Sequence, residues 1–271
     1  MEFKLPERPE ISNKGSFGKV LNISGSKYMT GAAVLSSQAA LKSGCGYVFL
    51  ACDGEVRHAV SAQTQSVVFA PAEKIPEILP TVQAVLIGCG LGIDERAQQI
   101  FDTVFEQKIN VPVVIDADGL NLLAQKIPEN LPEKLILTPH PKEASRLLGG
   151  VEVDEILADT EKFARKITEK YGCTTVLKSA ETVVCSKSGE IFKNNVPNSA
   201  IAKAGSGDVL SGIIVSLLAQ GLDEFNSAKT GAKLHSLAGL AAREKLGAFS
   251  VLPSDIINFL PDAISKLYYE L

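Results

Sequence analysis

Short apolar runs alternate with longer stretches in which apolar residues have the spacing of a helix. This alternation restricts the fold more than any other feature of the sequence. The apolar runs are rich in valine, isoleucine and leucine and hold four or five residues each. Strands of this kind joined by helices predict a mostly parallel sheet that is covered by helices on both faces. The expected strands are residues 20–24, 47–51, 66–69, 84–88, 112–116, 135–138 and 174–178.

Helical spacing fills most of the intervals between these strands. A length of 271 residues is enough for one large core, and no repeat or convincing linker divides the chain, so we predict a single α/β domain over residues 1–271. A hairpin is expected near the middle of the second half, with strands at 183–186 and 191–193 around the turn 187–190. The expected helices are residues 31–43, 95–107, 142–148 and 155–171, followed by mostly helical structure from Asp208 onward.

Charge and cysteine usage argue against several classes of protein. The formal net charge is −4, so there is no basic surplus to neutralise a nucleic-acid backbone. The five cysteines are scattered without the spacing of zinc ligands, which indicates reduced thiols and a cytoplasmic protein. No run at the N-terminus resembles a signal peptide, and no apolar window is long enough to span a bilayer.

One segment has the composition of a phosphate-binding turn. The small residues Ala204, Gly205, Ser206 and Gly207 lead to a single carboxylate, Asp208, and an apolar helix pattern starts immediately after it. Small residues let the backbone approach a ligand, and the free N–H groups of a helix start suit a phosphate. This indicates phosphoryl transfer, with Asp208 beside the reacting hydroxyl. The alternative is an ordinary loop in which Asp208 is the helix N-cap.

The carboxyl ends of parallel strands meet at one edge of a sheet, where ligands bind in such folds. We therefore expect the residues after each strand to line one crevice with the turn at 204–208. The expected strand ends are residues 25–26, 88–90, 116–121, 138–141 and 178–179.

Polar side chains at two of these strand ends are candidate ligand contacts. Two prolines flank His140 and project its imidazole outward, while Glu143 stands at a helix start; the alternative is a stiff turn in which Glu143 favours the helix dipole. Asp118 and Asn121 follow Asp116, the last residue of a buried strand, and suit contacts with substrate or with the waters of Mg²⁺; the alternative is turn and capping chemistry.

Three further features have weaker signals. Lys178 could reach nucleotide phosphates, although it could equally belong to a solvated turn. The glycines of 88–92 lack the spacing of a dinucleotide fingerprint and indicate a close approach of the backbone to some ligand. His235 lies in an apolar helix, where packing is the expected role.

Six motifs, in this order and spacing, resemble the ADP/ATP-dependent NAD(P)H-hydrate dehydratases over nearly the whole chain, from residue 14 to residue 255. The resemblance implies a ribokinase-like three-layer α/β/α sandwich with a central, mostly parallel sheet. It also implies repair of the S-epimer of hydrated NADH and NADPH: ADP or ATP phosphorylates the ring hydroxyl, and phosphate then leaves. The motifs are Gly25-Ser-Lys-Tyr-Met-Thr-Gly31-Ala32-Ala33, Ser43-Gly-Cys-Gly46, Ile87-Gly-Cys-Gly90-Leu-Gly92, Asp116-Ala-Asp-Gly-Leu-Asn121, Leu137-Thr-Pro-His-Pro-Lys-Glu143 and Ala204-Gly-Ser-Gly-Asp208.

The resemblance also assigns roles by position. Asp208 corresponds to the catalytic aspartate. The amides of Ala204, Gly205, Ser206 and Gly207 correspond to the anion hole. Ala32, Gly90 and His140, with Asp208, correspond to contacts of the hydrated dinucleotide. The ADP/ATP contacts correspond to Lys178, Ser179, Ala180, Glu181, Thr182 and Gly207.

Other expectations follow from the same resemblance. Mg²⁺ is the expected cofactor, with no direct protein ligand assigned, and Asp118, Asn121 and Glu143 remain candidate contacts of substrate or Mg²⁺-bound water. We expect ADP as the usual donor, a homo-oligomer (a tetramer) and a separate epimerase as functional partner, but no membrane or nucleic-acid partner. The chain departs from the family pattern at Cys89, where proline is common, at Lys142, where glycine is common, and at Ala204-Gly-Ser-Gly, where Gly-Gly-Thr-Gly is commoner.

Two alternatives stay open at this point. One is a ribokinase-like kinase of a small alcohol or vitamin precursor, and the other is a catalytically silent nucleotide-binding protein. An intact Asp208 argues against the second. The helix start is expected to lower the pKa of Asp208, which would leave it ionised and a weak base.

Overall fold

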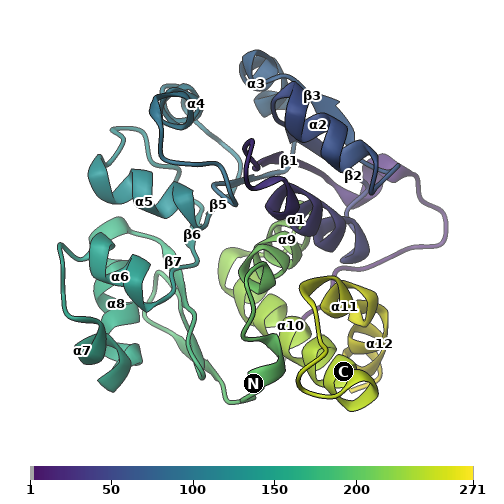
Figure 1. The fold of residues 1–271 in the computed structure, drawn as a ribbon, viewed down its shortest axis with the longest axis vertical. Coiled ribbons are helices and arrows are strands. Elements are labelled where there is room, and N and C mark those ends of the chain that lie inside the picture. Colours follow the sequence, from purple (N-terminus) through teal and green to yellow (C-terminus); the bar gives the residue numbers. More distant parts are fainter. Residues whose placement is uncertain (1–2, 271) are drawn as a thin grey trace.

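A nine-stranded sheet lies between two layers of helices in the computed structural model, which describes residues 3–270 (Figure 1). The strands follow the order β3-β2-β1-β4-β5-β6-β7-β8-β9; neighbours from β3 to β7 are parallel, and β8 and β9 continue the sheet as an antiparallel hairpin. The strands are β1 (Lys19–Ile23), β2 (Tyr47–Ala51), β3 (Val68–Ala70), β4 (Ala84–Ile87), β5 (Val113–Ile115), β6 (Leu135–Leu137), β7 (Thr174–Leu177), β8 (Thr182–Cys185) and β9 (Ile191–Asn194).

All the predicted strands, the hairpin and the three-layer α/β/α sandwich are confirmed. One helix prediction needs correction, and a further helix begins where turn chemistry was one of the two interpretations. The helix expected at 155–171 is two helices, because Asp159 leaves the helical conformation and its side chain caps the next helix at Lys162 N. The segment 116–121 is not only a turn, since a helix begins at Asp118.

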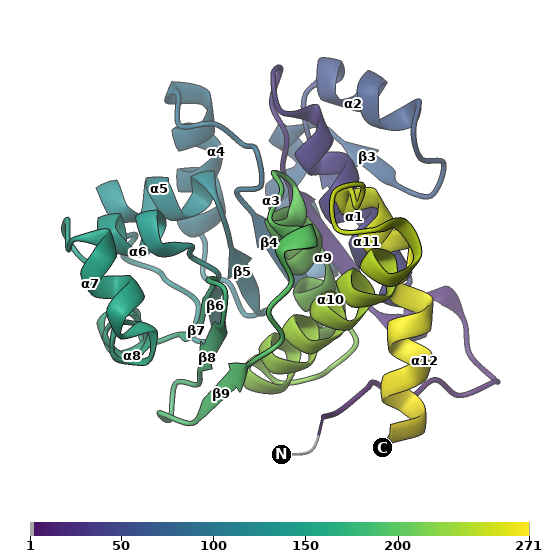
Figure 2. The same ribbon diagram turned by 60° about the horizontal axis from the view of Figure 1, so that its bottom comes forward.

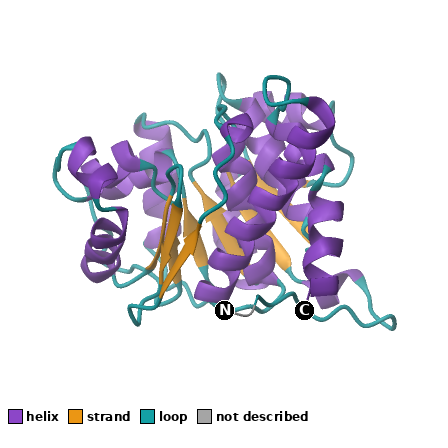
Figure 3. Ribbon diagram, turned by 90° about the horizontal axis from the view of Figure 1, so that it is seen from below, coloured by secondary structure: helices purple, strands orange, loops and turns teal. Residues whose placement is uncertain are grey.

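Helices cover both faces of the sheet (Figures 2 and 3). Among the described residues, none of these helices is both long and apolar enough to cross a membrane. They are α1 (Thr30–Lys42), α2 (Gly54–Ser61), α3 (Ile75–Ile78), α4 (Glu95–Phe105), α5 (Asp118–Gln125), α6 (Pro141–Leu147), α7 (Val153–Ala158), α8 (Thr160–Tyr171), α9 (Ser206–Ala219), α10 (Glu224–Leu246), α11 (Pro253–Asn258) and α12 (Leu260–Glu270). Short 3₁₀ turns occur at Lys14–Phe17, Ala72–Lys74, Leu79–Thr81 and Ser199–Ile201.

Alternate residues of each strand serve two separate cores, because successive side chains of a strand point to opposite faces. Val85 and Ile87 of β4 pack with residues of α3 to α8. Ala84 and Leu86 of the same strand pack with residues of α1, α9 and α10 on the other face. This two-sided burial is why the strands read as continuous apolar runs in the sequence.

Helix α9, whose first turn contributes to the site, is the most deeply buried of the helices around it. Twelve of its residues, from Ser206 to Ala219, are buried, and it packs against both α1 and α10 as well as the sheet. Helices α11 and α12 pack outside this layer, against α10 (Figure 1). The packing on several sides fixes the start of α9 at the edge of the sheet where the parallel strands end.

Candidate active site

A cavity of ≈ 700 Å³ opens at the carboxyl ends of β5, β6 and β7, against the start of α9. The residues that follow these three strands therefore meet the turn at 204–208 in one crevice, as predicted. Residues 25–26 and 88–90, which follow β1 and β4, were also expected in this crevice, but none of them lines this cavity. The lining residues that bear on function are Asp116, Ala117, His140, Glu143, Lys178, Ser179, Ala180, Thr182, Ala204, Gly205, Ser206, Gly207, Asp208 and His235.

The turn before α9 has the backbone geometry of an anion site. Gly205 is the N-cap, with φ of 96°, and it places no side chain over the helix start. Among residues 3–270, the N–H groups of Gly207 and Asp208 donate to no protein acceptor, so they are available to a ligand. Asp208 lies within the first turn and is not the N-cap, so the ordinary N-cap interpretation is wrong.

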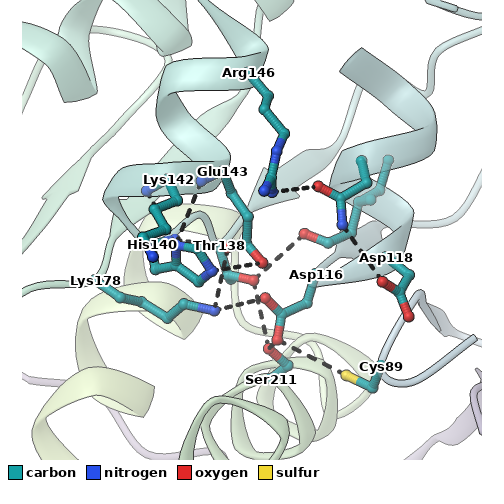
Figure 4. A network of polar contacts seen from close by, with 12 residues as sticks. Cys89, Asp116, Asp118, Thr138, His140, Lys142, Glu143, Arg146, Lys178 and Ser211 are labelled. Carbon is teal, nitrogen blue, oxygen red and sulfur yellow. Dashed lines mark hydrogen bonds and ion pairs between the residues drawn. The ribbon is translucent and has the colours of Figure 1, made fainter. Parts of the chain in front are cut away.

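Two buried charges lie beneath this turn. Asp116 follows β5 and is only 1% exposed, and its Oδ1 lies 2.7 Å from Nζ of Lys178, which follows β7 (Figure 4). Burial opposes both charges, but each group favours the charge of the other, so the pKa of Asp116 is held below its usual value and the pKa of Lys178 above it. The solvated-turn alternative for Lys178 is therefore wrong.

The pKa of Asp208 is shifted in the opposite direction from the sequence-based expectation. Burial, followed by the negative charge of Asp116, raises the pKa of Asp208 to about 6, and these effects outweigh the helix start. Asp208 is thus mostly ionised at neutral pH but is a stronger base than an exposed aspartate. A pKa near the working pH suits a group that accepts a proton during a reaction.

The motif around His140 is both a helix cap and part of the cavity wall. His140 Nδ1 accepts the N–H groups of Lys142 and Glu143 at 3.1 and 3.3 Å, and Glu143 Oε2 accepts the N–H of His140 at 2.7 Å (Figure 4). Burial, followed by the nearby Lys178, lowers the pKa of His140, so a neutral ring presents its Nε2–H toward Glu143 or a ligand. Burial likewise raises the pKa of Glu143 to about 7. The stiff-turn interpretation holds for the backbone, while both side chains face the cavity.

Asp118 and Asn121 are engaged in links between elements. Asp118 Oδ2 accepts the N–H of Gly92 at 2.9 Å, and Asn121 Oδ1 accepts a hydrogen bond from Arg146 at 2.8 Å. Neither side chain lines the 700 Å³ cavity. In this structure they hold α5 to the loop after β4 and to α6, and their roles toward substrate or Mg²⁺-bound water stay predictions.

Ala32 and Gly90 lie together, in a second region of the same edge. A Cβ placed on Gly90 would lie 2.7 Å from Cβ of Ala32. The adjoining residue, Cys89, connects this region to the cavity. The thiol sulfur of Cys89 and one carboxylate oxygen from each of Asp116 and Asp208 all lie within 4.8 Å of one another. Asp208 therefore stands where the two regions meet.

This cluster is poorly suited to enclose Mg²⁺. Mg²⁺ prefers oxygen ligands in octahedral geometry, whereas Cys89 offers a sulfur and Asp116 is already paired with Lys178. The residues fit a Mg²⁺ ion that is bound mainly by nucleotide phosphates and water, with no all-protein cage.

Two features of the site were missed by sequence reasoning. Ala117, between Asp116 and α5, is the only non-glycine residue among those described with positive φ (48°), a strained conformation of the kind found at functional sites. His235 of α10 is buried as expected, but its Nε2 also lies 3.0 Å from both Oγ and O of Ser206, so it braces the first turn of α9. Burial lowers the pKa of His235 to about 4, which keeps it neutral. No local pattern in the sequence signals either feature.

The chain is similar to known proteins over most of its length. A family model described as NAD(P)H-hydrate dehydratase matches residues 20–262. The chain is 40% identical over 245 residues to an ADP-dependent (S)-NAD(P)H-hydrate dehydratase of Neisseria meningitidis, which covers 89% of this chain and 82% of that protein. It is 34% identical to a bifunctional NAD(P)H-hydrate repair enzyme of Moorella thermoacetica, over 99% of this chain but 53% of the relative, so it spans about half the length of that enzyme.

The fold is also similar to a solved structure. The crystal structure of the ADP/ATP-dependent NAD(P)H-hydrate dehydratase of Bacillus subtilis, co-crystallized with ATP and Mg²⁺, matches with a TM-score of 0.88 and 29% identity. The match covers 97% of this chain and 94% of that one.

Proposed function

The chain belongs to the NAD(P)H-hydrate dehydratase family, and we propose that it uses ADP or ATP to dehydrate the S-epimer of hydrated NADH and NADPH. The observation that carries the proposal is the position of Asp208. Asp208 lies where the cavity meets the Ala32–Gly90 region, and its carboxylate is more basic than that of an exposed aspartate. The free N–H groups of the α9 start and the ammonium of Lys178 lie near it.

The chemistry follows from the loss of water across a double bond. Asp208 accepts the proton of the ring hydroxyl, and the hydroxyl oxygen attacks the terminal phosphorus of the nucleotide. The bond from that phosphorus to the bridging oxygen breaks, so AMP leaves when ADP is the donor and ADP leaves when ATP is the donor. Hydroxide is a poor leaving group, whereas the phosphate so formed can leave with the electron pair of the C–O bond. Loss of a proton from the neighbouring ring carbon then restores the double bond of the reduced nicotinamide.

The protein contributes mainly position and charge to this reaction. The transition state of phosphoryl transfer is loose, and its charge spreads over the phosphate oxygens. The free N–H groups of Gly207 and Asp208 and the ammonium of Lys178 are fixed donors for such oxygens, whereas the N–H of Ser206, in the predicted anion hole, donates to Lys203 O. Mg²⁺ bound to the nucleotide would neutralise phosphate charge.

The test is a direct assay of the repair reaction. The protein is incubated with Mg²⁺, hydrated NADH and either ADP or ATP, and recovery of the absorbance of reduced nicotinamide is followed. We expect nucleotide-dependent recovery, faster with ADP. No recovery with either nucleotide, together with phosphorylation of a small alcohol, would replace this proposal with the kinase alternative.

The rate should depend on the ionisation of Asp208. Only the carboxylate can accept the proton, and its pKa is raised to about 6, so kcat/KM should fall about tenfold per pH unit below pH 6. The measurement is the pH profile of kcat/KM with hydrated NADH in a constant ionic-strength buffer. A rate that stays constant down to pH 4.5 would contradict the assignment of Asp208 as the proton acceptor.

We further propose the wider context of the enzyme. The bifunctional relatives support functional coupling to an epimerase, which a separate protein would supply in the cytoplasm. The single sheet supports treating the predicted domain 1–271 as one unit, although residues 1, 2 and 271 lie outside the described part. We also propose a homotetramer, which light scattering of the purified protein would test.

A further inference from the structure

Asp116 is the centre of the buried polar network, yet none of the roles proposed above belongs to it. Its Oδ1 pairs with Lys178 Nζ at 2.7 Å, and its Oδ2 accepts a hydrogen bond from Ser211 Oγ at 2.7 Å. Cys89 Sγ lies 3.8 Å from the same Oδ2. These partners come from the segment after β7, from α9 and from the loop after β4, so one carboxylate joins three parts of the site (Figure 4).

The ion pair lies directly under the first turn of α9. A Cβ placed on Gly207 would lie 3.3 Å from Lys178 Nζ and 3.9 Å from Asp116 Oδ2. The ammonium therefore stands beside Gly207, whose free N–H would meet the oxygens of a bound phosphate group. A side chain at 207 would press on the ammonium.

A second carboxylate competes for the same ammonium. Glu143 Oε2 lies 4.0 Å from Lys178 Nζ, on the α6 side of the cavity, whereas Asp116 Oδ1 lies at 2.7 Å. A lysine ammonium on a flexible stem moves to its strongest partner. Without the charge of Asp116, Lys178 would turn toward Glu143 and away from Gly207.

We propose that Asp116 is a positioning residue for phosphoryl transfer, which holds the Lys178 ammonium beneath Gly207 against the competing carboxylate of Glu143. The strained Ala117 that follows Asp116 is held by two hydrogen bonds, from Asp116 N to Ile87 O and from Asp118 N to Gly88 O. These bonds fix the backbone from which the Asp116 side chain extends. This inference rests on the proposed function, because it concerns the same reaction.

The test is a double-mutant cycle of Asp116→Asn and Lys178→Met. Each single variant should lower kcat about 100-fold, the effect of removing one oriented electrostatic contact to the transition state, with a smaller change in KM for ADP. If Asp116 acts through Lys178, the double variant should be no slower than the slower single variant, within about threefold. Effects that multiply to about 10⁴-fold, or an Asp116→Asn variant with the wild-type kcat, would overturn the proposal.

The double variant also protects the test against misfolding. Asp116→Asn leaves a buried ammonium without its partner and so threatens stability, whereas the double variant leaves no unpaired charge at either position. Should Asp116→Asn fail to fold, equal kcat of the double variant and Lys178→Met supports the proposal, and a much slower double variant overturns it. Glu77→Gln is the matched control, because it removes the carboxylate of an exposed pair with Lys74 at the same short range, 2.6 Å.

A pH profile separates positioning from a merely structural role. The charged and titratable groups that face Asp208 are Asp116, Cys89, Lys178 and Asp118, from the end of β5, the loop after β4, the end of β7 and the start of α5. Removing the negative charge of Asp116 should move the acid limb of kcat/KM about one unit toward lower pH. A limb that does not move in Asp116→Asn counts against the proposal.

The failure of this inference is distinguishable from failure of the proposed function. If the wild-type protein shows no nucleotide-dependent dehydration, the function itself is wrong. If the wild-type protein is active and the double-mutant cycle is multiplicative, only the role of Asp116 is wrong.

Discussion

Replacing Asp208 by asparagine is expected to lower kcat for hydrate dehydration by about 10³-fold or more. Asparagine keeps the shape of the side chain but cannot accept the proton of the ring hydroxyl. Asp208 also lies where the cavity meets the Ala32–Gly90 region, and no other carboxylate stands in the first turn of α9. The measurement is the steady-state rate with saturating ADP, Mg²⁺ and hydrated NADH.

The Asp208→Asn variant should fold normally. The folded protein raises the pKa of Asp208 to about 6, so the carboxylate is ionised less readily in the folded state than in the unfolded chain. Its ionisation therefore opposes folding as pH rises from the unfolded pKa through 6, and asparagine removes this cost. We expect Tm at pH 7.5 to be equal to or higher than that of the wild type.

Asp223→Asn is a suitable control for this experiment. Asp223 is the N-cap of α10 and accepts the N–H of Asn226 at 2.8 Å, a role that asparagine also fills. Its turnover should stay within about twofold of the wild type, the small effect expected of a cap-preserving change. Wild-type turnover in Asp208→Asn would remove Asp208 from the mechanism.

Replacing Gly88 by alanine is expected to damage both stability and activity. Gly88 directly follows β4 with φ of 120°, and an added Cβ would lie 2.1 Å from Asp116 O and 2.4 Å from Gly119 N. Rigid backbone atoms must move to admit the methyl group, and alanine disfavours this φ in any case. We expect a loss of about 3 kcal/mol or more in the free energy of unfolding, seen as a fall of about 10 °C in Tm.

Activity should fall with stability in this variant, since the displaced backbone carries Asp116. We therefore expect Gly88→Ala to lose most of its turnover even at temperatures where it remains folded. Gly54→Ala is the matched control, because a Cβ there meets nothing within 4 Å and Gly54 is the first residue of α2. The control should keep the wild-type Tm and rate, and a Gly88→Ala protein that does the same would show that the β4 and β5 ends are not tightly packed.

The sequence also suggested that the glycines of 88–92 allow a close approach to a ligand. The close approach at Gly88 is to the protein's own backbone, at the junction of β5 and α5. Glycine patterns show that space is needed but not what fills it. The neighbours of Gly88, Asp116 and Gly119, come from a segment that is distant in the sequence, so only the assembled sheet identifies them.

Local patterns predicted most of the architecture. The strands followed from apolar runs that are buried on both faces, and the α9 start followed from small residues before a long apolar helix. Helix α5 was missed because Asp118, Gly119 and Asn121 are typical of turns, and the helix forms through packing of Leu120, Leu122 and Leu123 in the core. Tertiary burial outweighed local preference there.

The sequence by itself determined the class of fold, the edge of the sheet that carries the site and the candidate proton acceptor, because periodicity and small-residue turns are local properties of the chain. Only the tertiary structure decided the charge state of that acceptor and the partner of Lys178. The pair joins residues 62 positions apart, and the Ser211–Asp116 hydrogen bond joins residues 95 apart. A pKa depends on burial and on the distances between charges, and both arise only when distant segments meet.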